Sequence, residues 1–216
     1  MAIDKIAGIL EHIDPQISTI LHRALEDEEI SWQDGLHLCE TNGIDFHAVC
    51  LVADEMRKRQ VGDVVTYVVN RNINFTNVCI KHCTFCAFSR EYREEEGYFL
   101  PEEEIIRRAQ EAVDMGATEV CLQAGLPPKM KGSLYIDLTR AVKKEFPDLH
   151  IHAFSPEEVL YGSLRSGVSI LQYVRELKDA GLDTLPGTSA EILDQEIRDI
   201  IAPGRITTKQ WIEVIT

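Results

Sequence analysis

Three cysteines fall within one short stretch of the chain, with the spacing C-x3-C-x2-C and an aromatic residue, Phe85, before the last of them. Thiolates are the usual ligands of iron–sulfur clusters, and a cubane cluster has four irons to ligate. Cys79, Cys83 and Cys86 therefore leave one iron open, where a substrate or a cofactor can bind directly. The spacing predicts a [4Fe–4S] loop that serves chemistry rather than a sealed electron relay.

Other uses of these thiols have to be weighed. Disulfides are disfavoured, because the loop holds an odd number of cysteines and nothing in the sequence indicates secretion. A structural zinc site made of the three thiols and His82 is chemically permissible. Zinc ligands usually come as two separated pairs, however, so we expect His82 not to bind a metal. The remaining cysteines are expected to be small buried apolar residues; they are Cys39, Cys50 and Cys121.

The composition narrows the class of protein. With 216 residues, 44% of them hydrophobic, the chain is long enough to bury a substantial core. The net charge of −14 argues against a nucleic-acid partner, since phosphate backbones are bound by basic surfaces. The acidic runs at 94–96 and 102–104 are expected around a helix start, where they complement the helix dipole. The first residues lack the basic and apolar blocks of a signal peptide, and no apolar run approaches the ~18 residues that span a bilayer. We therefore expect a cytoplasmic protein with no membrane partner.

The chain is expected to have two parts, a small helical region over residues 1–62 and an α/β region over residues 63–216. In the first part, Ser31 and Asp34 resemble a capping box at the start of a helix. Asn42-Gly43 is expected to end that helix, and Asp45 to cap the next one.

The second part alternates extended segments with helical ones. Its first strand is expected to begin at Val64 and to continue with period two through Asn70, Asn72 and Asn74. Alternation of this kind implies parallel β–α–β units with right-handed crossovers, so we predict a partial (β/α) barrel of the TIM type. An edge strand that faces water and a strand that lines a polar substrate cavity explain the asparagines about equally well. Further strands are expected at 118–123, 150–154 and 182–185, with helices at 101–115, at 133–146 and up to Ala180.

The unusual loops all follow strands, and in barrels the chemistry sits at the carboxyl ends of the strands. The cysteine loop follows the first strand, Gln123 to Pro128 the second, Ser155 to Glu158 the third, and Pro186 to Glu191 the fourth. Ser155 also suits the N-cap of a helix with Pro156 at its first position. It can cap this helix and line the site at the same time. His150 and His152 lie on one side of a strand; for His152, cavity and satisfied-core roles remain open.

The cysteine loop, placed after a barrel strand, resembles that of the radical S-adenosylmethionine (SAM) enzymes. The resemblance implies a radical SAM barrel in which SAM chelates the open iron, and reductive cleavage of SAM gives a 5′-deoxyadenosyl radical. The cofactor then carries the difficult step. The residues that the resemblance places on the cluster are Cys79, Cys83 and Cys86. Those that it places near SAM are Phe85, Gln123, Gly125, Ser155 and Glu157. A wider substrate cavity would include Asn72, Asn74, His152, Thr188 and Glu191.

Within these enzymes, the segments 65–77, 152–156 and 185–193 resemble one branch, which contains menaquinone-pathway futalosine enzymes and deazaflavin-forming FO synthases. Pro-Gly-Thr-Ser at 186–189 is similar to the 4-hydroxyphenyl transferases of FO synthesis. Their reaction cleaves L-tyrosine and adds its 4-hydroxybenzyl group to 5-amino-6-(D-ribitylamino)uracil. The implied partners are a reductant protein for the cluster and FO synthase subunit 1, which closes the ring. A futalosine enzyme and an inactive, metal-stabilised interaction fragment are the alternatives.

Two departures from the family pattern stand out. Gln123-Ala124-Gly125 replaces the usual Gln-Gly-Gly, so an extra methyl group must be accommodated. Only four strands are expected before Thr216, whereas a complete barrel has eight. We therefore expect a C-terminally truncated barrel. Its last helix, with Trp211, Ile212 and Ile215, would lack part of its packing partner.

Overall fold

The computed structural model of the protein describes residues 2–90 and 96–216. The chain divides into two compact units, Met1–Thr66 and Tyr67–Thr216. Glu94 and Glu95 lie outside the described residues, whereas the acidic run at 102–104 occupies the first turn of a helix, as predicted. None of the helices in the described part of the chain is long and apolar enough to cross a bilayer.

The N-terminal unit is helical, as the sequence predicts. Asp14 caps the second helix, because its Oδ1 accepts hydrogen bonds from the backbone N–H groups of Gln16 and Ile17 at 2.8 and 3.2 Å. The predicted capping box of Ser31 and Asp34 is confirmed at the third helix. The helices of this unit are α1 (Ala2–Leu10), α2 (Pro15–Leu25), α3 (Trp32–Cys39) and α4 (Gly43–Val61).

The expected start of α4 is wrong. Asn42, not Asp45, is its N-cap residue, and Gly43 opens the helix instead of only ending the previous one. The Asp45 carboxylate accepts the backbone N–H of Asp14 at 3.0 Å. It therefore ties α4 to the start of α2 instead of capping its own helix.

The expectation that the other cysteines are buried is also wrong. Cys39 and Cys50 are exposed, and Cys121 is only half-buried. The buried face of α4 is formed by Ala48 and Val52. Cys50 is two positions from each of them, and a helix turns by about 200° over two residues, so its side chain faces solvent.

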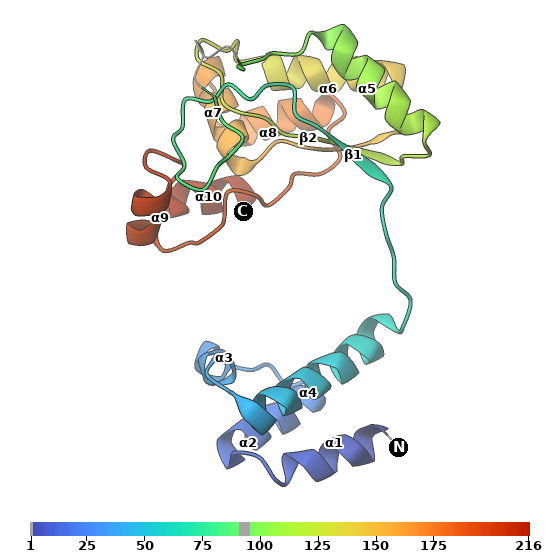
Figure 1. Ribbon diagram of the computed structural model, residues 1–216, viewed down its shortest axis with the longest axis vertical. Coiled ribbons are helices and arrows are strands. Elements are labelled where there is room, and N and C mark those ends of the chain that lie inside the picture. The colour runs from blue at the N-terminus through green and yellow to red at the C-terminus, as the bar shows by residue number, and fades with distance from the viewer. Residues whose placement is uncertain (1, 91–95) are drawn as a thin grey trace. The chain divides into compact units, whose positions relative to one another are not determined.

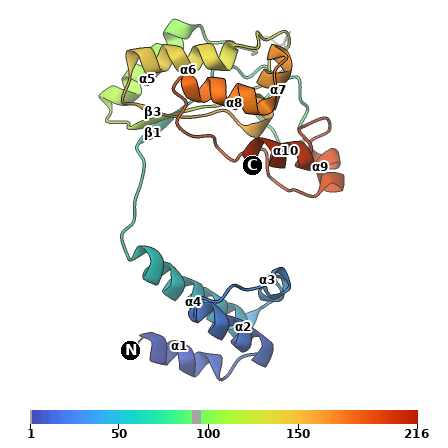
Figure 2. The ribbon, with the colours of Figure 1, turned by 180° about the vertical axis from the view of Figure 1, so that it is seen from behind.

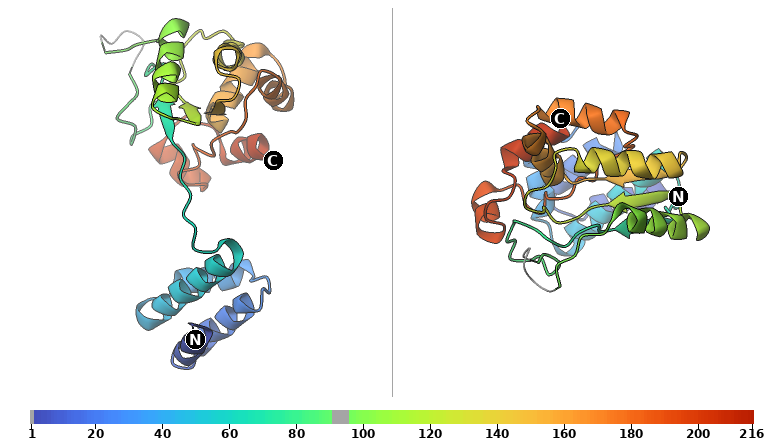
Figure 3. Two further views of the ribbon diagram at one scale, coloured as in Figure 1. Left: turned by 90° about the vertical axis from the view of Figure 1, so that its right-hand side faces the viewer. Right: turned by 90° about the horizontal axis from the view of Figure 1, so that it is seen from above.

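The C-terminal unit is built from parallel strands and helices. Its sheet has the order β1-β2-β3, and all pairs are parallel. Helices α5, α6 and α8 lie along one side of the strands (Figures 1 and 2) and run beside one another when seen from above (Figure 3, right). This arrangement confirms the predicted α/β class and its partial barrel. The elements are β1 (Asn70–Ile73), α5 (Glu102–Asp114), β2 (Glu119–Leu122), α6 (Leu134–Glu145), β3 (His150–Ala153), α7 (Pro156–Ser166), α8 (Ile170–Asp179), α9 (Gln195–Ile201) and α10 (Thr208–Ile215).

Two of the expected strands are shorter than predicted. Val64 and Val65 are 80% and 90% exposed and lie outside β1, which begins at Asn70. β2 begins at Glu119, opposite Asn70, and only the carbonyl of Val69 is still paired, with the N–H of Thr118 at 2.9 Å. The apolar residues before Val69 are not part of the ladder. The expected strand at 182–185 is reduced to an isolated parallel bridge between His152 and Thr184. A preference for extended backbone does not make a strand without a partner.

The two faces of the sheet differ in chemistry. Val120, Leu122, Ile151 and Ala153 are fully buried and join the main core. Their neighbours along β2 and β3 are half-buried, because successive side chains of a strand point to opposite faces. The opposite face therefore carries Glu119, Cys121, His150 and His152, and the prediction that the two histidines share a side is confirmed.

The last helix, α10, packs against α7. Val214 is buried, and Trp211 packs partly against the core while its Nε1 donates to the carbonyl of Thr188 at 3.0 Å. Ile212 and Ile215 remain 46% and 44% exposed. The two isoleucines are therefore exposed, whereas Trp211, which was expected with them to lack part of its packing, is held by the loop that precedes α9.

Candidate active site

The three loop cysteines line one cavity of about 220 Å³ at the carboxyl ends of the strands. The loop backbone is fixed to its surroundings. The N–H of Cys79 donates to the carbonyl of Arg90 at 3.0 Å, and the N–H of Ile80 to that of Leu126 at 2.9 Å. Both the N–H and the hydroxyl of Thr84 donate to the carbonyl of Ile201, each at 2.9 Å. The thiols are therefore presented by a segment tied to the loop after β2 and to the end of α9.

Gly125 is required by the close approach of two loops. A Cβ atom at this position would lie 2.4 Å from the carbonyl oxygen of Val78 and 3.0 Å from the Cβ of Cys79. The N–H of Gly125 donates to the carbonyl of Thr76 at 3.0 Å. By contrast, Ala124 is partly buried against the core. The additional methyl group at 124 is thus accommodated, whereas one at 125 would not be.

Glu157 is almost fully buried beside the cavity and is surrounded by donors. Its carboxylate lies 3.4 Å from the Nζ of Lys81 and 3.6 Å from the Nε of Arg205. It also accepts the backbone N–H of Ile206 at 2.6 Å. A buried carboxylate needs such partners. Glu157 therefore joins the cysteine loop to the segment before α10.

Arg205 brings a positive charge to the cavity wall. Its Nη1 donates to Glu191 Oε1 at 2.9 Å, and its guanidinium carbon lies 5.8 Å from the ring centroid of Phe85. Its Nη2 donates to the hydroxyl of Ser189, a buried residue with a φ of 67°. Burial raises the pKa of the Cys83 thiol, and the charge of Arg205 opposes that rise.

Glu158 connects the loops after β2 and β3. Its Oε2 accepts the N–H and the hydroxyl of Ser155, both at 2.7 Å, and its Oε1 accepts the N–H of Ala124 at 3.0 Å. Ser155 in turn caps α7, which has Pro156 in its first turn, so the predicted N-cap is confirmed. Burial raises the pKa of Glu158 to about 7, against the lowering effect of these hydrogen bonds.

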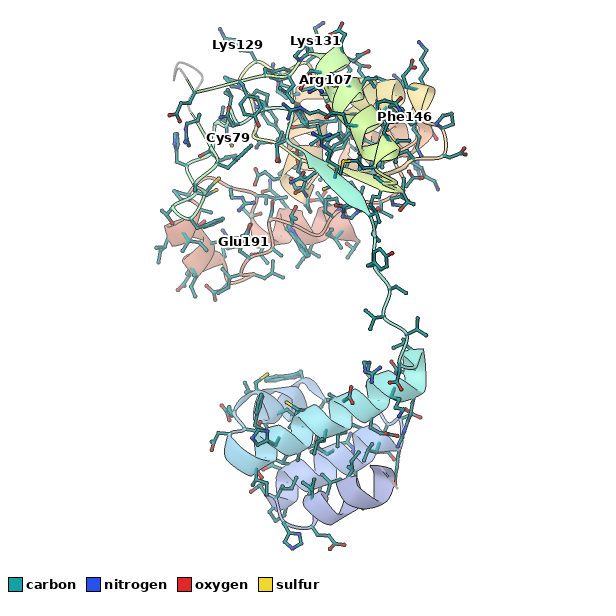
Figure 4. All side chains as sticks on the ribbon, turned by 45° about the vertical axis from the view of Figure 1, so that its right-hand side comes forward. Cys79, Arg107, Lys129, Lys131, Phe146 and Glu191 are labelled. Carbon is teal, nitrogen blue, oxygen red and sulfur yellow. The ribbon has the colours of Figure 1, made fainter. Side chains whose placement is uncertain are left out.

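Most of the residues predicted for the site meet at this cavity. Figure 4 shows Cys79 and Glu191 at one end of the unit and Phe146, before β3, at the other. Asn72 and His152 do not line the cavity and instead share a row of the sheet with Cys121. Thr188 does not line the cavity either, although its hydroxyl oxygen accepts a hydrogen bond from Gln123 Nε2 at 3.1 Å. The predicted residues that do line it are Asn74, Cys79, Cys83, Phe85, Cys86, Gln123, Gly125, Ser155, Glu157 and Glu191.

The reasoning from sequence did not assign eight further residues that line the cavity; they are Lys81, Phe88, Ser89, Ala124, Leu126, Glu158, Ser189 and Arg205. Glu158 could have been found, because Ser-x-x-Glu before an apolar run is the signature of a capping box. Lys81, Ser189 and Arg205 carry no comparable local pattern. Arg205 reaches the cavity only because a distant segment packs there, whereas Lys81 lies within the cysteine loop itself and Ser189 within the loop expected after the fourth strand.

Comparisons with known proteins agree with this geometry. The sequence pattern of the Radical SAM superfamily matches residues 73–216. The 5-amino-6-(D-ribitylamino)uracil–L-tyrosine 4-hydroxyphenyl transferase of Cyanothece sp. is 44% identical over 208 residues, which cover 93% of this chain and 54% of that protein. The FO synthase of Streptomyces avermitilis is 45% identical over 207 residues, covering 95% of this chain and 24% of that protein. The chain thus spans about half of the first relative and about a quarter of the second.

Solved structures share the fold at low sequence identity. A crystal structure of HydG, a maturase of the [FeFe]-hydrogenase, is 15% identical, with a TM-score of 0.69 over 98% of this chain and 46% of that one. Methylornithine synthase (PylB) is 18% identical, with a TM-score of 0.52 over 76% of this chain and 57% of that one. The superfamily implies a [4Fe–4S] cluster and SAM as cofactors. By its sequence match over most of its length and by its fold, the chain belongs to the radical SAM superfamily.

Proposed function

We propose that this chain acts on L-tyrosine and 5-amino-6-(D-ribitylamino)uracil, transferring the 4-hydroxybenzyl group of the amino acid to the uracil in deazaflavin (FO) synthesis. The observation that carries the proposal is the convergence of three thiols on one polar cavity in a chain that is 43% to 46% identical to transferases and synthases of this name. The extent of the match across both units, 93% of the chain or more, supports the specific activity beyond the superfamily.

The donor set of the cavity fits a cluster with one open iron. Cys79, Cys83 and Cys86 are the cysteines that line it in the described part of the chain. Its carboxylates are already engaged: Glu157 and Glu191 by Arg205, and Glu158 by N–H and hydroxyl donors. Among the described residues that line the cavity, these groups leave no free carboxylate or fourth thiol, so the fourth iron would be left for SAM. When bound, the cluster and SAM would supply one-electron cleavage of a carbon–sulfur bond and a carbon radical able to abstract hydrogen.

Protein groups would bind and orient SAM and shield it from water. Arg205 and Lys81 provide positive charge for the carboxylate of its methionine portion, and Glu157 holds both cations in place. Phe85 supplies an apolar wall beneath Arg205. Gln123 and Ser155 supply polar groups at the rim, while Gly125 allows the second loop to approach the cysteines.

The substrates would lie beyond SAM, against the polar face of the sheet. Asn74 is positioned by its hydrogen bond to the carbonyl of Gln123 at 2.7 Å. Asn72 and His152 continue the same polar face. From the loop before α9, Thr188 accepts a hydrogen bond from Gln123, and Glu191 lines the cavity. Amide and hydroxyl groups match the ribityl hydroxyls and the phenol of these substrates.

The test is product analysis with the cluster assembled anaerobically. The chain is incubated with SAM, a reductant, L-tyrosine and 5-amino-6-(D-ribitylamino)uracil, and the products are identified by mass spectrometry. We expect a 4-hydroxybenzyl adduct of the uracil, together with 5′-deoxyadenosine and methionine, and no product from Cys83→Ala. Turnover of a futalosine derivative instead would replace the proposal with the menaquinone-pathway alternative. Zinc in place of iron would favour an inactive, metal-stabilised fragment.

A further inference from the structure

A second group of ligand-type side chains lies on the polar face of the sheet, apart from the cysteine cavity. Glu119 and His150 are register neighbours on β2 and β3, and His152 follows on the same face of β3. One side-chain donor atom from each of the three lies within 4.8 Å of the other two. None of these residues lines the cavity of the three cysteines.

The orientation of these side chains is already fixed by neighbours. Asn70 Nδ2 donates to Glu119 Oε1 at 3.0 Å, which leaves Oε2 directed toward His150 Nε2 at 3.8 Å. The hydroxyl oxygen of Thr184 lies 2.8 Å from His150 Nε2 and 2.7 Å from His152 Nδ1. Both imidazoles therefore converge on one point, with the carboxylate beside them. The bond from Asn70 orients the carboxylate through its other oxygen, as hydrogen bonds behind the ligands do at metal sites, whereas the Thr184 hydroxyl occupies the point on which the two imidazoles converge.

We propose that Glu119, His150 and His152 bind a divalent cation of the zinc or iron(II) class. Two imidazoles and one carboxylate are a common ligand set for these ions, whereas calcium and magnesium prefer oxygen alone. Metal–ligand distances of ~2.1 Å put neighbouring ligand atoms ~3.4 Å apart in a tetrahedral site, so a small inward movement of the rings would complete it. Thr184 either turns away or supplies a weak further ligand.

A metal held by Glu119, His150 and His152 could also bind a ligand from solution. The side chain of His150 is 38% exposed and that of Glu119 is 17% exposed. Three protein ligands on an accessible face keep a coordination position open, as in catalytic rather than structural metal sites. The alternative is that the histidines serve only to hold Thr184 beside β3, where it forms its bridge with His152.

Cobalt(II) distinguishes these possibilities, because its spectrum reports its ligands. The full chain with Cys79→Ala, Cys83→Ala and Cys86→Ala is titrated with Co²⁺, so that the cysteine loop cannot contribute. We expect one Co²⁺ per chain, with visible ligand-field bands and no thiolate charge-transfer band. His150→Ala or His152→Ala should weaken binding ~100-fold, and Asn70→Ala ~10-fold through loss of orientation of the carboxylate. His22→Ala, an exposed histidine of the N-terminal unit, is the matched control and should change nothing.

A second measurement covers the case in which the triple variant does not fold. The unmodified chain, with its cluster assembled anaerobically, is equilibrated with Zn²⁺ and desalted, and zinc and iron are counted by mass spectrometry. One zinc per chain beyond the cluster iron, lost in His152→Ala while iron is retained, supports the site. No retained zinc, or zinc unaffected by His152→Ala, overturns it. Neither result depends on the proposed transferase activity.

Discussion

Gly125→Ala tests how closely the loop after β2 must approach the cysteine loop. The new Cβ would lie 2.4 Å from the carbonyl oxygen and 2.8 Å from the carbonyl carbon of Val78. Ordinary contacts of carbon are about 3.5 Å or longer, so one backbone would have to move by about 1 Å. Both loops resist that movement, because the Gly125 N–H donates to Thr76 and the Ile80 N–H donates to Leu126.

The expected loss of stability in Gly125→Ala follows from these contacts. Overpacking costs about 1–3 kcal/mol, and weakening the two backbone hydrogen bonds adds about 1 kcal/mol. We therefore expect the free energy of unfolding to fall by about 2–4 kcal/mol. Because the backbone would move next to Cys79, the cluster should also dissociate more readily.

The measurements are denaturant unfolding followed by circular dichroism, and iron retained after reconstitution and desalting. Gly187→Ala is a matched control in the loop before α9, since a Cβ there meets nothing within 4 Å. If Gly125→Ala and Gly187→Ala had equal stability and equal iron content, the close approach would not be what requires glycine at 125.

Further predictions concern single side chains of the cavity. Cys83→Ala should abolish cluster assembly, whereas Cys121→Ala and His82→Ala should keep the iron content and the visible spectrum; loss of iron in His82→Ala would revive a zinc-type ligand set. Arg205→Ala should weaken SAM binding in equilibrium dialysis roughly tenfold, as expected for the loss of a charge-assisted hydrogen bond, with partial recovery in Arg205→Lys. Unchanged affinity would remove Arg205 from the cofactor. Glu158 has a pKa of about 7 in the folded chain against 4.5 ordinarily, so its neutral form is favoured by folding. Its contribution to stability is full below pH 4.5 and is lost as the pH rises through 7, by about 3 kcal/mol. Glu158→Gln should remove this slope in denaturant unfolding of the metal-free chain, and an unchanged slope would assign it to another group.

Sequence reasoning succeeded where a feature depends on neighbours along the chain. The spacing of Cys79, Cys83 and Cys86 placed three thiols on one cavity, and the capping boxes at Ser31 and Ser155 formed as predicted. The helices between the first three strands were also predicted to within a residue at each end. Caps and helix periodicity are set by backbone geometry within one or two turns.

Sequence reasoning failed where strand formation or burial depends on contacts with residues that are distant along the chain. The apolar run from Val64 has every preference of a strand, yet β2 begins too late to pair with it. Cys50 has the chemistry of a buried residue, but the rotation of α4 turns it to solvent. Neither the pairing register nor the helix face can be read from these residues alone.

The sequence by itself determined the cysteine loop, the alternation of strands and helices, and the superfamily, because each depends on the spacing of residues that are close along the chain. Only the tertiary structure decided which charges meet. Arg205 reaches Glu157 and Glu191, and His150 reaches Glu119, through the packing and register of segments that are distant along the chain. The physical reason is that electrostatic and hydrogen-bond partners must come within a few ångströms, and the register of the sheet and the packing of its loops set those distances.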